Sequence, residues 1–134
     1  MAAYGVLVRN GQIVLCRLSA RVPQAVGRWT LPGGALWFGE APADAVVREF
    51  HEETGLRVES REVLHVGSRM VKRDGDRAHS VQILYRVTLV GDDIRLTPEI
   101  DGSTDTCAWH LLSEAHRLPL VDISEEALAL AQDW

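Results

Sequence analysis

Short apolar runs separated by turn signals make up most of the chain and predict β-strands. The first two runs, residues 3 to 9 and 12 to 18, are joined by Asn10-Gly11. This dipeptide favours the positive backbone angles of a tight hairpin turn, so a hairpin is predicted to open the chain. Further strands are predicted at residues 29 to 31, at about 58 to 71 and 79 to 90 on either side of Asp74-Gly75, and around 106 to 111.

One segment has a helical period instead. From Pro42 to Thr54 the apolar side chains recur at three- and four-residue spacing, at positions 43, 46, 47 and 50. Proline suits the first turn of a helix, and Gly55 suits its end. Two short helices are predicted near the C-terminus, with Ser113 and Ser124 as their N-caps.

Strands mixed with helices in this order predict an α/β domain with a mixed sheet covered by helices. Residues 19 to 28 lack periodicity and predict a loop, and we expect the strand that follows to end at Pro32-Gly33-Gly34. A chain of 134 residues has the size of one compact domain, so residues 1–134 are expected to fold together.

Composition narrows the class of partner. A formal net charge of -5 argues against binding to duplex nucleic acid, although it leaves single nucleotides open. The two cysteines, Cys16 and Cys107, are far apart in the sequence and lack zinc or redox spacing, which favours a reduced cytoplasmic protein. No run approaches the roughly 20 apolar residues of a membrane span, so no membrane partner is expected.

The predicted helix carries three glutamates on one face. Each helical residue advances by about 100°, so Glu49, Glu52 and Glu53 fall within about 100° of one another. Like charges at this spacing destabilise a helix by roughly 0.2 to 0.5 kcal/mol per pair, which calls for a compensating cation. Arg48 supplies part of the compensating positive charge, and a hard divalent ion such as Mg²⁺ would supply more. For the helix alone, a solvated charged face is the ordinary explanation.

The residues around these glutamates resemble the signature of a known family, the Nudix hydrolases. Their conserved box has a glycine, a glutamate, an Arg-Glu pair, an apolar residue, a Glu-Glu pair, a glycine and a final apolar residue at fixed positions. Between Gly34 and Leu56 the chain fills all nine places, with these two residues and Glu40, Arg48, Glu49, Phe50, Glu52, Glu53 and Gly55. Such a match is far more specific than a lone pair of glycines.

The resemblance implies an α/β/α sandwich and a set of site residues. Mg²⁺, with Mn²⁺ as a substitute, would be held by Glu49, Glu52, Glu53 and the backbone at Gly34. Arg48 would orient the glutamates, and Glu40 would brace the preceding loop against the helix. The general base would be Glu52 or Glu53. Relatives are often homodimers, although nothing in the sequence locates an interface.

Other residues are weaker candidates because plain structural roles explain each of them. Arginines and aromatic rings near the box suit phosphate contact and base stacking, and the candidates are Arg17, Arg28, Trp37 and Phe38. Relatives recruit a further acid from a distant loop, and the candidates here are Glu99, Asp101 and Asp105. Packing, solvation and turn formation are the competing explanations.

The function implied by the resemblance is magnesium-dependent hydrolysis of a diphosphate linkage, by attack of water at phosphorus in a nucleoside diphosphate derivative. The proline typical of relatives that act on ADP-ribose is absent from its usual place, and the tyrosine of dinucleoside-polyphosphate hydrolases is not at its usual distance. Two alternatives remain: a Nudix-like module that binds a nucleotide without cutting it, and an isomerase of allylic diphosphates, for which a chain this short leaves little room.

Overall fold

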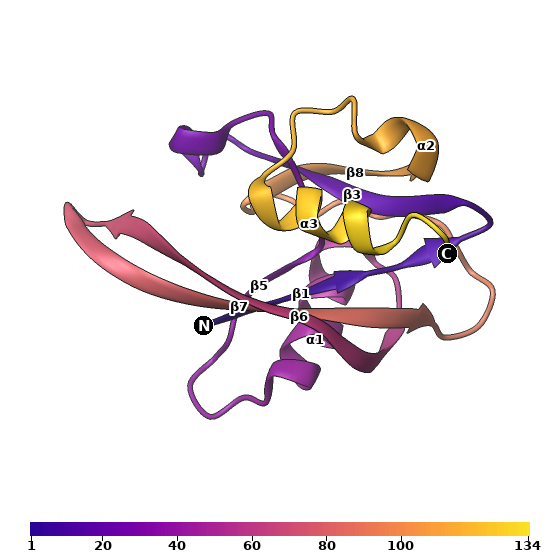
Figure 1. Cartoon of the computed structure of the whole chain (residues 1–134), viewed down its shortest axis with the longest axis horizontal. Helices are drawn as coiled ribbons and strands as arrows, with labels where there is room; N and C mark the ends of the chain where they lie inside the picture. Colours follow the sequence, from indigo (N-terminus) through magenta and orange to yellow (C-terminus); the bar gives the residue numbers. More distant parts are fainter.

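Two four-stranded sheets and three α-helices form the fold in the computed structural model, which describes residues 1–134 except the side chain of Arg73. The first sheet has the strand order β5 (Gly33–Ala35), β1 (Ala2–Val6), β7 (Asp76–Leu89) and β6 (Val58–Arg73). Its β1 and β7 are parallel, whereas its other neighbours are antiparallel, so the sheet is mixed. Figure 1 shows the long β6–β7 hairpin extending beyond the rest of the molecule.

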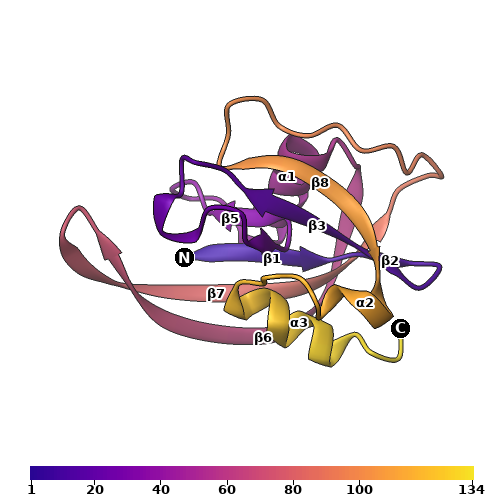
Figure 2. The same ribbon diagram turned by 90° about the horizontal axis from the view of Figure 1, so that it is seen from above.

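The second sheet is antiparallel and is built around β3 (Gln12–Leu18). Its other strands are β2 (Val8–Arg9), β4 (Trp29–Thr30) and β8 (Thr104–Leu111). Strands β2 and β4 pair with one edge of β3, and β8 pairs with the other. Seen from above, β3 and β8 run side by side and approach the end of β1 (Figure 2).

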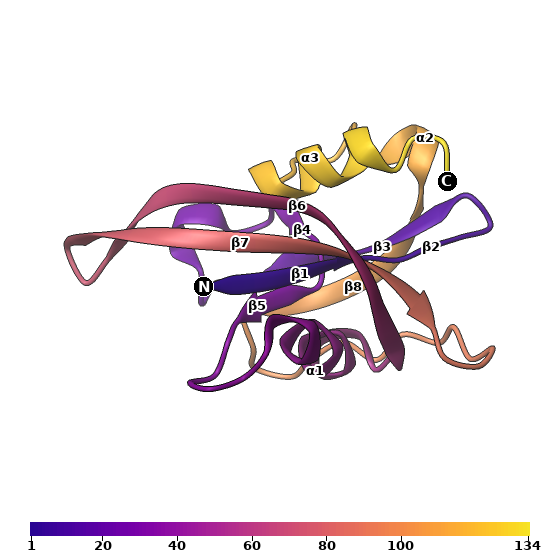
Figure 3. The same ribbon diagram turned by 60° about the horizontal axis from the view of Figure 1, so that its bottom comes forward.

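Helices cover both faces of this arrangement. The helices are α1 (Pro42–Thr54), α2 (Leu112–Ala115) and α3 (Asp122–Leu130), and a 3-10 turn spans Pro23–Ala25. Figure 3 shows α1 on one side of the strands and α3 on the other. Each side has its own apolar core: Phe50 of α1 packs in one, and Leu128 of α3 packs in the other. The expected α/β/α sandwich with a mixed sheet is therefore confirmed.

Helix α1 has the predicted bounds because its local signals agree. Pro42 occupies its first turn, and Gly55 ends it in the left-handed conformation with a φ of 77°. The Gly55 N–H donates to the His51 carbonyl at 2.9 Å. The apolar face is buried as expected, but it also takes Glu53 into the interior.

The first hairpin is shorter than its apolar runs predict. The turn itself is confirmed, since Asn10 and Gly11 have φ values of 50° and 75°. However, only Val8–Arg9 pairs with β3, because the preceding residues leave to pair with β7 and β5 in the other sheet. Apolar patterning shows that a residue is buried, but not which sheet it joins.

The strand at Trp29 ends before Pro32 as expected, but Gly33 and Gly34 then form a further strand, β5, that the sequence did not predict. Gly33 has a φ of 154°, and a Cβ atom there would lie 2.3 Å from the Ala3 carbonyl oxygen. Only glycine permits this close approach of β5 to β1. The pairing places the backbone of Gly34 opposite Ala3, next to helix α1.

The two serine caps were also wrong. Leu111 and Val121 occupy the N-cap positions of α2 and α3, and neither makes a side-chain cap. Ser124 is instead buried inside α3, where its Oγ accepts a hydrogen bond from the Leu31 N–H at 2.9 Å. The serine links helix α3 to the segment that follows β4.

No helix in the described part of the chain is both long and apolar enough to cross a membrane.

Candidate active site

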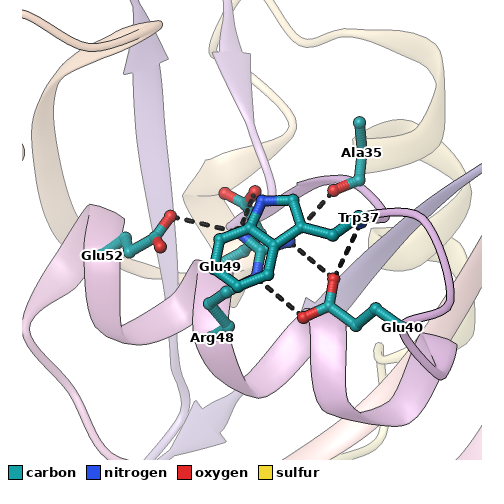
Figure 4. Close-up of polar contacts among 6 residues, drawn as sticks. All are labelled: Ala35, Trp37, Glu40, Arg48, Glu49 and Glu52. Carbon is teal, nitrogen blue, oxygen red and sulfur yellow. Dashed lines mark hydrogen bonds and ion pairs between the residues drawn. The ribbon is translucent and has the colours of Figure 1, made fainter.

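Arg48 lies at the centre of the polar cluster on α1. Its Nε and Nη2 atoms donate to the two Glu40 oxygens, both at 2.8 Å, and Nη2 also reaches the Ala35 carbonyl at 3.1 Å (Figure 4). The Trp37 ring lies over the guanidinium, 3.9 Å from ring centroid to Cζ. Glu40 also accepts the Trp37 N–H at 3.0 Å, so it ties the loop to the helix as the family resemblance implies.

The pairing of Arg48 with Glu40 shifts the pKa values of both side chains. Hydrogen bonds from Arg48 and from the Trp37 backbone lower the pKa of Glu40 to about 2. The same contact with Glu40, assisted by Glu49, raises the pKa of Arg48. Arg48 is only 14% exposed and stays charged, so it is a fixed cation among the acids.

The remaining Arg48 nitrogen holds two of the box glutamates. Nη1 lies 3.0 Å from Glu49 Oε1 and 3.3 Å from Glu52 Oε2. The Glu49 side chain is 15% exposed and that of Glu52 is 42% exposed, so they occupy the wall and the rim of the site. Arg48 thus orients these two carboxylates from one turn of α1.

Glu53 is the buried member of the group. It is 3% exposed, and its Oε2 is one of two buried side-chain atoms, among those that the structure describes, without a hydrogen-bond partner. Burial raises its pKa well above the ordinary value, and a hydrogen bond with Glu49 and the charges of Glu49 and Glu99 raise it further. An unpartnered buried carboxylate oxygen is costly, which marks this position as functional.

The surroundings of Glu53 suit a hard divalent cation. A Cβ on Gly34 would lie 3.0 Å from Glu49 Oε1, so the missing side chain keeps open a space bounded by carboxylate and backbone. As the described side chains stand, no three acidic, histidine or cysteine residues lie close enough together to form a metal site. In this arrangement Arg48 holds Glu49 and Glu52 by hydrogen bonds, and Glu53 is buried. Oxygen donors and an unpartnered Oε2 still fit Mg²⁺ or Mn²⁺.

Of the three candidates for a further acid, Glu99 is the one that faces this cluster. Burial raises its pKa, and so do the charges of Glu49 and Glu52. Asp105 is instead paired with Arg17, at 3.1 Å from Oδ1 to Nε. Asp101 has a φ of 56° in an exposed turn.

A cleft of about 420 Å³ opens beside Glu53. The glycines of β5 and Thr30 of β4 form one part of its wall, and Val121 and Ile123 at the start of α3 form another. Besides Thr30 and Glu53, the polar side chains that line it are Tyr4, Gln24, Arg69, Gln82, Ser103 and Thr104. The cleft thus combines apolar side chains with many polar groups, which suits a polar small molecule.

The substrate-binding candidates from the sequence do not line this cleft. Arg17 pairs with Asp105, and Arg28 donates to the Leu120 carbonyl at 3.3 Å. Trp37 covers Arg48, and Phe38 is fully exposed at the loop tip. Contacts within the protein therefore explain the positions of Arg17, Arg28 and Trp37.

Sequence patterns missed the residues that do line it. Tyr4 is on β1, Gln82 is on β7 and Arg69 is on β6, so they meet only through sheet pairing. Arg69 is held by an ion pair with Asp122 at the start of α3. Tyr4 has a raised pKa because of its burial and of the nearby charges of Glu53 and Glu49. No local sequence motif predicts that Tyr4, Gln82 or Arg69 lines the cleft.

Comparison with known proteins agrees with this arrangement. A family model described as the NUDIX domain matches residues 1–131. The chain therefore belongs to the Nudix family, as its box indicates.

Its relatives come from several bacteria. The chain is 30% identical over 94 residues to an uncharacterized Nudix hydrolase, YvcI, of Bacillus subtilis, a match that covers 70% of this chain and 58% of that protein. It is 38% identical over 91 residues to a Mycobacterium tuberculosis protein provisionally named 8-oxo-dGTP diphosphatase 2, covering 68% of this chain and 62% of that one. The matches thus span less than two thirds of these relatives.

A solved structure extends the likeness of fold to nearly the whole chain. The MutT NUDIX hydrolase of Burkholderia pseudomallei superposes with a TM-score of 0.75 at 24% identity, over 96% of this chain and 95% of that one.

Proposed function

We propose that the protein hydrolyses a diphosphate linkage in a nucleoside diphosphate derivative, with Mg²⁺ as its cofactor. The observation that carries the proposal is the position of Glu53, a buried carboxylate with an unpartnered oxygen on the wall of a cleft. A buried carboxylate oxygen without a hydrogen-bond partner destabilises the fold, and such groups are concentrated at functional sites. Membership of a family whose named relatives are hydrolases and diphosphatases supports the choice of reaction.

The cation would be held by Glu49, Glu52, Glu53 and the backbone at Gly34. When bound, a divalent cation acidifies water and offsets the charge that develops on phosphate oxygens. Arg48 keeps two of these carboxylates in place, and Glu40 keeps Arg48 in place. This chain of contacts pre-orients the acids before a substrate arrives.

Glu53 is our choice of proton acceptor. Its raised pKa makes it a stronger base than an exposed glutamate, and it borders the cleft in which the attacked phosphate would lie. Glu99 would be the further acid, since its charge interacts with Glu49 and Glu52 across the same space. Glu52, on the rim, would serve mainly as a ligand.

The cleft beside Glu53 would hold the nucleoside. Its apolar wall suits a base, while Gln82, Gln24 and Thr104 offer hydrogen bonds to a polar edge. The relative named as an 8-oxo-dGTP diphosphatase makes purine nucleoside triphosphates the first substrates to test.

We also propose that the protein works in the cytoplasm, because its two cysteines are free thiols and its proposed substrates are nucleotides.

The deciding experiment is a panel of nucleoside triphosphates, 8-oxo-dGTP, ADP-ribose and dinucleoside polyphosphates, with and without Mg²⁺. Products would be identified in water enriched in heavy oxygen, which labels the phosphorus that is attacked. Glu53→Gln is expected to abolish turnover. Glu114→Gln makes the same chemical change at an exposed position on α2, and it should retain full activity.

Two results would contradict the proposal. If no compound in the panel is hydrolysed but one binds tightly, the protein is a nucleotide-binding module. If turnover leaves the diphosphate intact, the reaction is an isomerisation.

A further inference from the structure

The two cysteines, distant in the sequence, lie directly opposite each other in the second sheet. Cys16 of β3 is paired with Cys107 of β8 in the antiparallel register. Both are free thiols, with exposures of 0% and 8%. The interaction between the two thiols raises the pKa of Cys16 and lowers that of Cys107.

The backbone bonds on either side of β3 show which kind of pair this is. On the β4 side, the Leu18 N–H donates to the Arg28 carbonyl at 2.8 Å. Backbone groups of alternate residues point to the same side of a strand, so those of Cys16 also point toward β4. They are therefore directed away from Cys107 on β8.

The β8 side leads to the same conclusion independently. There the Leu112 N–H donates to the Gly11 carbonyl at 2.9 Å, which makes these two residues a hydrogen-bonded pair. The register runs without a shift from Gln12 to Arg17, and bonded and non-bonded pairs alternate along it. Counting five positions from Gly11 makes Cys16 and Cys107 a non-hydrogen-bonded pair.

This geometry is within the reach of a disulfide. Non-hydrogen-bonded pairs have Cα atoms about 4.5 Å apart, and disulfides span roughly 4.4 to 6.8 Å between Cα atoms. No backbone hydrogen bond stands between the two side chains, and both thiols lie on the α1 side of the sheet, because Trp109, two residues beyond Cys107, packs with that core. Closing the bond therefore needs no change in the register of β3 and β8.

We propose that Cys16 and Cys107 form an oxidation site, at which a peroxide converts the two facing thiols into one cross-strand disulfide. Cys107, the more exposed, attacks the peroxide oxygen; the O–O bond breaks, one water leaves and a sulfenic acid forms. The Cys16 sulfur then displaces a second water and forms the S–S bond. Two thiols are oxidised by one peroxide, which is reduced to two molecules of water.

The site is coupled to the acidic cluster through Cys16, because the nearby carboxylate of Glu53 contributes to the raised pKa of the Cys16 thiol. Oxidation removes the thiol hydrogen and draws the sulfur toward β8. This coupling rests on the proposed function, whereas the disulfide itself does not.

The test uses the full chain, treated with hydrogen peroxide and then quenched. Its intact mass is expected to fall by two hydrogen atoms, and a peptide map should contain Cys16 joined to Cys107. Denatured, treated protein should then offer no thiol to an alkylating reagent, and a dithiol reductant should restore both. In Cys107→Ser the Cys16 thiol should survive the same treatment. If serine unfolds the protein, Cys107→Ala keeps an apolar side chain at the position.

Three outcomes would overturn the proposal: two free thiols after treatment, added oxygen without a cross-link, or cross-links only between molecules. Nucleotide hydrolysis is then compared in the oxidised and re-reduced protein. A slower oxidised form supports the coupling to Glu53, and equal rates refute it. If neither form hydrolyses any nucleotide, the proposed function fails while the mass result still decides the disulfide.

Discussion

Replacing Glu53 with glutamine should stabilise the protein while it abolishes activity. The carboxyl is 3% exposed and its Oε2 has no partner, so the folded protein bears an uncompensated cost that the unfolded chain does not. Leaving a buried polar group unsatisfied costs roughly 1 to 3 kcal/mol. Glutamine has nearly the same shape and also buries a polar group, but it cannot ionise. Glu53→Gln therefore removes the cost of the buried charge, which we expect to be of the same order, roughly 1 to 3 kcal/mol.

The gain should depend on pH, and its sign follows from the raised pKa of Glu53. Between the unfolded value of 4.5 and the folded value, the folded protein holds a proton that the unfolded chain has released. Stability of the wild type therefore falls as pH rises through this range. Glu53→Gln lacks this loss, so its advantage should be small at about pH 5 and larger at about pH 8.

Thermal unfolding in the presence of a metal chelator measures the effect. An unfolding entropy of roughly 2.1 cal/mol/K per residue gives about 0.28 kcal/mol/K for a chain of 134 residues. The expected gain thus corresponds to a rise in Tm of about 4 to 11 °C at the higher pH. Glu114→Gln, at an exposed position, should change stability by less than about 0.5 kcal/mol. A Tm for Glu53→Gln at or below that of the wild type at about pH 8 would refute the reasoning.

Three further predictions concern the same site. Gly34→Ala should fold, since its Cβ meets only the movable Glu49 carboxylate, but it should bind Mg²⁺ about 10 to 100 times more weakly in calorimetry. Gly33→Ala should fail to fold, because its Cβ would lie 2.3 Å from a backbone oxygen. If both variants fold equally well, the described packing of β5 against β1 is contradicted. The Glu40–Arg48 pair, with the pKa of Glu40 at about 2, should stabilise the fold fully above pH 4.5 and lose this effect as pH falls toward about 2, so Glu40→Gln should flatten the acid limb of urea unfolding curves. Mg²⁺ at about 100 times its Kd should stabilise the wild type by about 2.7 kcal/mol, and the absence of any rise in Tm would count against the metal site.

Much of the helix and its chemistry was predictable because the signals are local. Pro42, the three- and four-residue apolar spacing and Gly55 all act within a few turns, so the bounds of α1 follow from neighbouring residues alone. The same holds for the turns at Asn10-Gly11 and Asp74-Gly75, whose φ values are positive as expected. The box also identified the family.

Contacts between distant segments were not predictable from any local pattern. Which sheet β1 joins, which glutamate is buried and which loop acid faces the cluster all depend on strand register and on how α1 packs against β5 and β1. Glu53 looked like a surface residue by its spacing, and Cys16 and Cys107 looked unrelated.

Amino-acid order thus determined the elements, because hydrogen bonds and side-chain periodicity within a helix or a tight turn involve residues a few positions apart. The tertiary structure decided the environment of each functional group, because burial, pKa and thiol pairing depend on atoms contributed by segments far along the chain. Glu53 illustrates both points. Neighbouring residues determine its position on α1, whereas its burial and its raised pKa depend on the strands that pack against the helix.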